Sequence, residues 1–410
     1  MTFWLFAYAF LGIAPFVQLR FGQDTDTTAS VNHDLDWEAS GAILIGCVVM
    51  LLGVALGQIQ RKSHRSMQSA TPEARPRASI PNHRAVTLLT VITLGIFGYY
   101  ASRVGFMQLF SSRMTLDSIR SRIWPDSTTA AIFTALTQMG LLVCVVAQIF
   151  LRRIDTGYSR RVVPSLLFIV SLISLVISTN PISSARYIFG TAALALVTSY
   201  GAVSSVRRFR IFSITSLVGM IYVFPIADMF RWSLSPTVKS QSPLTSMLSG
   251  DFDSYSQIVN TLEYVHVRGE VGGSQLAGVL LFWVPRSIWP GKPIDTGVLV
   301  AQFKGYGFTN LSEPIWGELL INGGIVLLIV GMFVLGLVIS KLDRRLDETI
   351  SHTGLPGVLG CILPFYLILV LRGSLLQSMA YLAVLLVGYR VISIGRASES
   401  APFGNLEAGN

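Results

Sequence analysis

Three arginines stand alone beside apolar runs, at Arg186, Arg286 and Arg372. A guanidinium group presents a planar fork of N–H donors, which binds phosphate oxygens in pairs. An arginine at a membrane boundary also has a simpler explanation, because its long side chain can reach the lipid headgroups. All three fall, by the charge distribution described below, on the side of the membrane that is poor in basic residues. Together they indicate a site for a phosphorylated lipid.

Arg286 lies within residues 283–324, the longest part of the chain that is neither an apolar run nor an ordinary loop. Lys292 follows between two prolines and would add a point charge to an anion site, although a solvated loop lysine explains it equally well. Glu318 begins an apolar run, where a carboxylate is costly and usually functional or paired. It would either orient an arginine or help to activate a hydroxyl group, and we favour the ion pair.

Four further candidates lie in the polar segment before Arg286. His266 is the only histidine between residues 231 and 313 and could act as a general base, although a single loop histidine is more often a surface residue. Tyr255, Tyr264 and Arg268 are candidates for binding the substrate. The tyrosines could stack on sugars, and ordinary loop packing is the competing explanation.

The composition is that of a membrane protein. The chain is 51% hydrophobic and 13% charged, whereas soluble proteins carry about 25% charged residues. Apolar runs of about 20 residues are long enough to cross the hydrocarbon core. They are continuous rather than alternating, which favours helices over barrel strands. The three cysteines lie inside such runs and are interpreted as small apolar residues. The predicted class is an all-α polytopic membrane protein.

We expect about ten transmembrane helices, with both termini in the cytoplasm. Their approximate ranges are 3–19, 41–59, 85–102, 129–151, 162–179, 187–206, 211–230, 315–340, 355–371 and 374–394. Basic clusters follow every even-numbered span, as the positive-inside rule requires of cytoplasmic segments. These segments hold most of the 31 Lys and Arg residues and few of the 22 acidic ones. Topology therefore explains the net charge of +9, and no nucleic-acid partner is needed.

This arrangement predicts a single transmembrane domain over residues 1–395, with a basic cytoplasmic linker at 60–84 and a disordered cytoplasmic tail at 396–410. One large loop, at about 231–313, falls on the extracytoplasmic face. Within it, residues 275–289 contain an apolar stretch too short to span, and such stretches are more often interfacial or re-entrant. We expect a short helix there that holds the following arginine at headgroup depth.

Two motifs resemble a known family. Residues 285–293, PRSIWPGKP, resemble the PR-x-x-WP-x-KP element of bacterial oligosaccharide repeat-unit polymerases, the Wzy-type O-antigen polymerases. The string GELLINGG at 317–324 resembles the GE element that follows it. Arg186 and Arg372 also stand where such polymerases carry outer-face arginines. The resemblance covers about residues 180–375 by motif and the whole chain by topology.

The resemblance implies an inverting, metal-independent glycosyltransferase in the bacterial inner (plasma) membrane, with its active site on the periplasmic face. A glycan on undecaprenyl pyrophosphate would be the donor, and a repeat unit on the same carrier lipid would be the acceptor. An acceptor hydroxyl would attack the anomeric carbon, and the lipid pyrophosphate would leave. Arg286 and Arg186 would bind that pyrophosphate with help from Arg372, supplying the stabilising charge. No cofactor is implied, and a chain-length regulator and a flippase are possible protein partners.

Other interpretations stay open. Metal-dependent transferases usually carry an Asp-rich motif, and the D-x-D string at residues 251–253 is only a three-residue match in a polar loop. The related O-antigen ligases carry an R-x-x-x-G element, which residues 186–190 fit. They also carry H-x-x-L-G-x-G, which the string at residues 266–272 does not complete. A transporter or flippase for a lipid-linked or anionic substrate would place polar residues at the midplane, whereas the charges here gather at the outer ends.

Overall fold

The computed structural model describes residues 2–68, 80–229 and 243–393 of the chain. The predicted tail, the middle of the predicted basic linker and the start of the predicted outer loop lie outside these ranges. Within them all regular secondary structure is helical, and the chain is a helical membrane protein, as the apolar runs predict.

The α-helices follow one another along the chain as α1 (Thr2–Tyr8), α2 (Ala14–Phe21), α3 (Asp36–Gln68), α4 (His83–Val104), α5 (Arg113–Ile123), α6 (Ser127–Ile154), α7 (Thr156–Arg160), α8 (Val162–Ser178), α9 (Arg186–Ser199), α10 (Val206–Met229), α11 (Pro243–Ser246), α12 (Ser254–Arg268), α13 (Ser274–Leu280), α14 (Thr296–Lys304), α15 (Ile315–Thr353), α16 (Gly357–Arg372) and α17 (Leu375–Ile392). A π-helical turn, η1 (Ala9–Ile13), joins α1 to α2. Short 3₁₀ turns are η2 (His33–Leu35), η3 (Phe106–Phe110) and η4 (Gly250–Phe252).

Six helical segments in the described part of the chain are long and apolar enough to cross a membrane. They are Thr2–Phe21, His33–Gln60, His83–Val104, Ser127–Ile154, Ile315–Ser351 and Leu375–Ile392. Helices α8 and α16 are also apolar but have only 17 and 16 residues. Helix α9 ends at Ser199, earlier than the span predicted to reach residue 206, and Gly201 follows with a positive φ of 95°. The total of ten spans and the orientation stay predictions.

Helix α6 forms the centre of the larger core. The Asp126 carboxylate caps its start by accepting from the Thr129 backbone N–H at 2.9 Å. The helix is buried almost continuously from Thr134 to Leu151 and packs against α4, α8, α9, α16 and α17. Inside this core the Gln148 amide donates to hydroxyl groups on α4 and α8, a typical bond between membrane helices.

A second core forms where the long helices α3 and α15 pack against each other and against α1 and α12. Glycines allow the two long backbones to approach closely. A Cβ atom at Gly336 would lie 2.2 Å from the Met50 carbonyl oxygen, and one at Gly53 would lie 2.3 Å from the Phe333 carbonyl oxygen. This contact fixes the position of α15.

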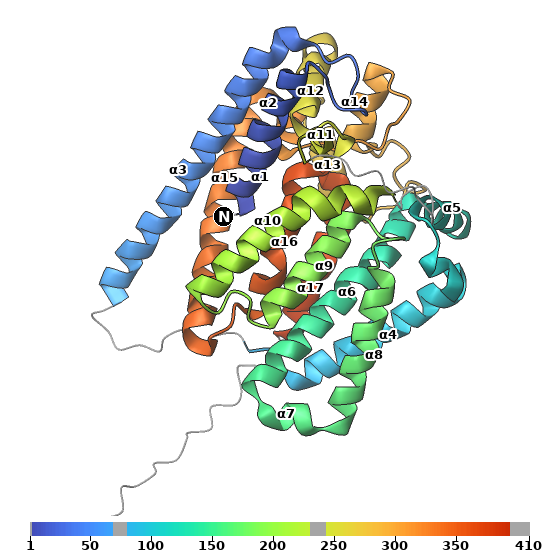
Figure 1. Cartoon of the computed structure of the whole chain (residues 1–410), viewed down its shortest axis with the longest axis vertical. Helices are drawn as coiled ribbons and strands as arrows, with labels where there is room; N and C mark the ends of the chain where they lie inside the picture. Colours follow the sequence, from blue (N-terminus) through green and yellow to red (C-terminus); the bar gives the residue numbers. More distant parts are fainter. Residues whose placement is uncertain (1, 69–79, 230–242, 394–410) are drawn as a thin grey trace, which may run out of the picture.

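One end of the bundle carries most of the short helices. Figure 1 shows α11, α12, α13 and α14 gathered there, with α7 at the opposite end. Apart from the half-buried Tyr255, helix α12 is buried over residues 254–262, so the described part of the predicted outer loop is a folded cap. The apolar stretch at 275–289 contributes the seven-residue helix α13 followed by turns. Leu280, Trp283 and Ile288 in this stretch are exposed, as an interfacial segment requires.

Candidate functional site

A cavity of about 390 Å³ opens at the capped end of the bundle. Its polar and charged lining residues are Asp26, Thr27, Arg113, Arg186, Tyr187, Ser249, Asp251, Asp253, Asn310, Ser312, Arg372, Ser374, Gln377, Ser378 and Tyr381. Leu311, Leu369 and Ile188 are among the apolar lining residues. A cavity of this size with a few convergent polar groups has the properties of a ligand site.

Every segment predicted to lie outside the membrane reaches this cavity. The first outer loop contributes Asp26, the second Arg113, the third Arg186, the long loop Asp251 and the last Arg372. None of the lining residues comes from a segment predicted to be cytoplasmic. The predicted outer segments therefore lie at one end of the bundle, as a two-sided topology requires. That this end faces the outside rests on the charge asymmetry of the sequence.

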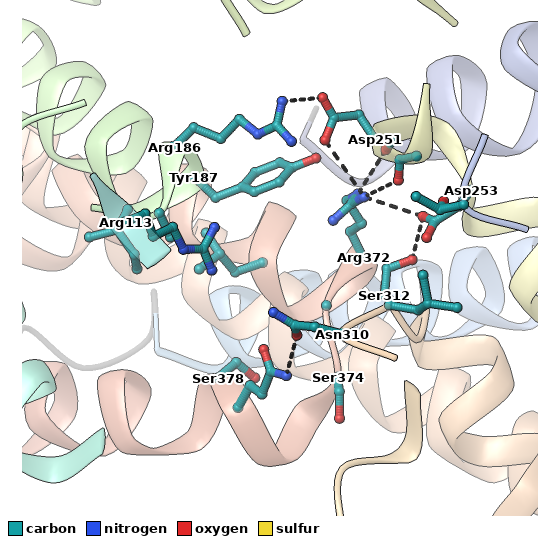
Figure 2. Close-up of a pocket in the computed structure, with 18 of the residues that line it drawn as sticks. Arg113, Arg186, Tyr187, Asp251, Asp253, Asn310, Ser312, Arg372, Ser374 and Ser378 are labelled. Carbon is teal, nitrogen blue, oxygen red and sulfur yellow. Dashed lines mark hydrogen bonds and ion pairs between the residues drawn. The ribbon is translucent and has the colours of Figure 1, made fainter. Parts of the chain in front are cut away.

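Arg186 is the first residue of α9 and Arg372 is the last residue of α16, so both stand at helix ends that face the cavity. The Arg186 guanidinium forms an ion pair with the Asp251 carboxylate. Arg372 donates to the carbonyl oxygens of Asp251 and Gly250, each at 2.9 Å, and to the Asp253 carboxylate at 3.2 Å. Figure 2 shows Asp251 joined to both arginines, and Arg372 joined to Asp253 as well. The structure therefore brings Arg186 and Arg372 together.

Asp253 is the most buried member of this group of ion pairs. Its side chain is 1% exposed, and the Ser312 hydroxyl donates to it at 2.5 Å. Burial raises the pKa of Asp253, while Arg372 and Ser312 oppose that shift by stabilising the carboxylate. The D-x-D string thus supplies counter-ions for arginines. In the part of the chain that the structure describes, no group of His, Cys, Asp and Glu side chains could hold a metal ion.

The aromatic ring of Tyr187 completes the wall next to Arg372. The guanidinium carbon of Arg372 lies 4.9 Å from the centre of that ring, within the range of a cation–π contact. The ring and the carboxylates hold the guanidinium planes in place. Fixed donors of this kind need no reorganisation when negative charge develops nearby.

Arg286 and Lys292 do not line the cavity. Arg286 donates to the carbonyl oxygens of Lys292 and Pro293 and so closes the turn that contains the PRSIWPGKP motif. The Lys292 ammonium donates to the carbonyl oxygens of Phe282 and Val284 at 2.6 and 2.9 Å, and to the Thr128 hydroxyl at 3.0 Å. Burial, and then repulsion from Arg286, lowers the pKa of Lys292. These two cations brace the turn against the start of α6.

Glu318 is fully buried, but its partners are not arginines. Its carboxylate accepts from the Thr296 hydroxyl at 2.8 Å, the Ser374 hydroxyl at 2.8 Å and the Leu375 backbone N–H at 2.9 Å. Across the described residues the structure contains no ion pair of Glu318, so the favoured ion-pair role is wrong. The backbone of α15 leaves helical geometry at Gly323 and Gly324, and the helical segment before this break, residues 315–322, holds the carboxylate next to Ser374, a cavity-lining residue.

The remaining predicted residues lie on the outer cap and not in the cavity. His266 and Arg268 are exposed at the end of α12, where the His266 imidazole lies 3.3 Å from the Glu38 carboxylate. The Tyr255 hydroxyl donates to Asp36, and burial raises the pKa of Tyr255 to about 12. The Tyr264 ring packs edge-on against a phenylalanine. The Tyr255 ring packs against the apolar core that includes α3 and α15, so sugar stacking by Tyr255 would first require that packing to open.

Several lining residues escaped the sequence interpretation, notably Arg113, Tyr187, Asp251 and Asp253. The two aspartates carry a signal, because acidic residues separated by a single residue in a polar loop also suit a pair of arginines. Tyr187 could have been found as the neighbour of Arg186. Arg113 stood in a predicted outer loop, where nothing in the local sequence distinguished it from other basic loop residues.

Comparison of the chain with protein-family models, with curated proteins and with solved structures finds no match.

Proposed function

We propose that the protein is a membrane glycosyltransferase that polymerises oligosaccharide repeat units carried on undecaprenyl pyrophosphate. The observation that carries the proposal is the meeting of Arg186 and Arg372 in one cavity at the predicted outer end of the bundle. The likeness of the motif at 285–293 to the polymerase element supports the same assignment. The enzyme would act at the outer leaflet of the plasma membrane, and its product would be an O-antigen, a capsule or an exopolysaccharide.

In this proposal the donor pyrophosphate lies against the arginine side of the cavity. The hydroxyl oxygen of the acceptor sugar forms the new bond to the anomeric carbon, and the bond from that carbon to the pyrophosphate oxygen breaks. The hydroxyl proton passes to a base, and the leaving pyrophosphate gains negative charge. Arg186 and Arg372 stabilise that charge because their planes are already held by Asp251, Asp253 and Tyr187.

The motif that supports the resemblance has a different role in this proposal from the one first expected. Arg286 and Lys292 hold the turn after α13 against α6 through backbone carbonyl groups. They would therefore shape the membrane-facing rim of the site instead of binding pyrophosphate. The apolar residues exposed on the same turn, Trp283 and Ile288, suit contact with the lipid surface from which the carrier lipid enters.

A ligase that transfers a finished glycan to another acceptor is the second candidate. Arg186 begins the R-x-x-x-G element that resembles the ligases, and it lines the cavity. Both enzymes would use the same donor pyrophosphate, so the cavity alone supports either. Supplying only lipid-pyrophosphate-linked repeat units separates them, because a polymerase extends these units and a ligase needs a different acceptor.

The test uses purified protein in lipid nanodiscs with lipid-pyrophosphate-linked repeat units as the only substrate. Wild-type protein should build a ladder of chain lengths, and Arg186→Gln and Arg372→Gln should leave single repeat units. Arg122→Gln is the matched control, since Arg122 is an exposed arginine outside the cavity, and its ladder should match that of the wild type. A normal ladder from both cavity variants would refute the proposal, provided that both purify as folded protein.

A further inference from the structure

A third arginine, Arg113, reaches the cavity from helix α5. Figure 2 shows its guanidinium inside the cavity and well apart from the Asp253 carboxylate. The helix that carries it is fixed, because the Arg120 side chain donates to the Tyr100 hydroxyl at 2.6 Å and the Ser112 side chain caps its start. The position of Arg113 is therefore built into the fold.

The charge of Arg113 is compensated less than that of the other two arginines. Arg186 and Arg372 are each held by a buried aspartate. Arg113 lies 3.9 Å from the carboxylate of Asp117, which is 48% exposed and also accepts from Arg120 at 2.9 Å. No hydrogen bond joins the Arg113 guanidinium to a carboxylate in residues 2–68, 80–229 and 243–393.

The charged residues that line the cavity also single out Arg113. Three arginines and three aspartates line it, and the third aspartate, Asp26, is exposed at the rim. The buried carboxylates Asp251 and Asp253 gather around Arg186 and Arg372. Asn310 and Gln377 contribute neutral amide groups to the lining, and these bond to each other at 3.2 Å. Among the described residues, Arg113 is therefore the lining arginine whose carboxylate partner is not buried.

We propose that Arg113 is a binding residue for the anionic group of the ligand, a diphosphate. The inference rests on the proposed function for the identity of the ligand as a lipid-linked pyrophosphate. Arg113 supplies the guanidinium that is free to turn toward the phosphate oxygens, while Arg186 and Arg372 supply donors whose orientation is already set. An arginine–phosphate contact is bidentate and charge-assisted, and it is worth more than a contact between neutral groups.

The experiment measures binding of inorganic pyrophosphate by calorimetry, with full-length protein in a maltoside detergent that contains no phosphate. Arg113→Gln should weaken binding by about 10- to 100-fold, the loss expected for one charged hydrogen-bonding partner. Arg122→Gln is the matched control, because Arg122 lies on the same helix but is exposed and does not line the cavity. Its dissociation constant should stay within about twofold of the wild type, since only surface charge changes.

Three results would overturn the inference: wild-type protein that binds no pyrophosphate, equal binding by Arg113→Gln, or an equal loss in Arg122→Gln. Tighter and Arg113-dependent binding of short-chain phosphatidylglycerol would assign the residue to phospholipid headgroups and would also overturn it. The polymer assay separates this inference from the proposed function. Arg113-dependent pyrophosphate binding without a polymer ladder refutes only the polymerase, whereas a normal ladder from Arg113→Gln with normal pyrophosphate binding refutes only the role of Arg113.

Discussion

The ion pair between Arg372 and Asp253 gives a quantitative expectation for stability. The guanidinium has two backbone carbonyl acceptors at 2.9 Å and the Asp253 carboxylate at 3.2 Å. Asp253 is 1% exposed, so its carboxylate depends on protein groups for its stabilisation. Breaking a buried ion pair by removing one member costs about 3–5 kcal/mol, because the other charge is left uncompensated. Arg372→Ala should lower the free energy of unfolding by about this amount.

Removing both charges should cost less than the two separate losses added together. In Arg372→Ala/Asp253→Asn the amide oxygen at residue 253 can still accept from the Ser312 hydroxyl, and residue 253 no longer carries an uncompensated charge. Groups within one ion-pair network are coupled by about 0.5–3 kcal/mol. The double variant should therefore be more stable than additivity predicts by an amount in that range.

The assay is equilibrium unfolding of purified protein by a denaturing detergent, applied to the wild type, the two single variants and the double variant. Arg268→Ala serves as a control for the loss of an arginine, because Arg268 is exposed, and it should change stability by less than about 0.5 kcal/mol. Losses from Arg372 and Asp253 that add within about 0.5 kcal/mol would refute the reasoning, since an additive pair is not coupled in the folded protein.

Two further changes test other parts of the fold. Burial, and then the nearby Glu318 carboxylate, raises the pKa of Glu313 well above 4.5, so the folded protein binds more protons than the unfolded chain and stability falls as pH rises through this window. Melting temperatures measured from about pH 5 to about pH 9 should fall less steeply with pH for Glu313→Gln than for the wild type. An equal slope for the two proteins would contradict the assignment. Gly336→Ala should destabilise the α3–α15 contact by about 1–3 kcal/mol, because its Cβ would meet the Met50 carbonyl oxygen at 2.2 Å. Gly98→Ala in open space should be neutral or stabilising, and equal melting temperatures for the two variants would exclude the close approach.

The membrane class and the candidate arginines followed from local sequence. Apolar runs predict membrane helices because the length of each run decides whether that run can cross the bilayer, whatever its neighbouring helices are. The distribution of basic residues likewise predicts that Arg186 and Arg372 lie on one side of the membrane, and in the structure both line the same cavity. Hydrophobic length and the number of basic residues are both properties of one short segment, so the local sequence is enough to recognise them.

Tertiary structure decided which charges meet. Arg186 and Asp251 are 65 residues apart in sequence, and Arg372 and Asp253 are 119 apart. Such pairs depend on which helix ends are neighbours, and no local pattern specifies that. For the same reason Arg286 lies outside the cavity, although the motif at 285–293 predicts a role for it in the site, and Arg113 enters the cavity from a loop that carries no motif. The sequence by itself determined a helical membrane protein with arginines at one end, and the packing of the helices determined which of them form the site.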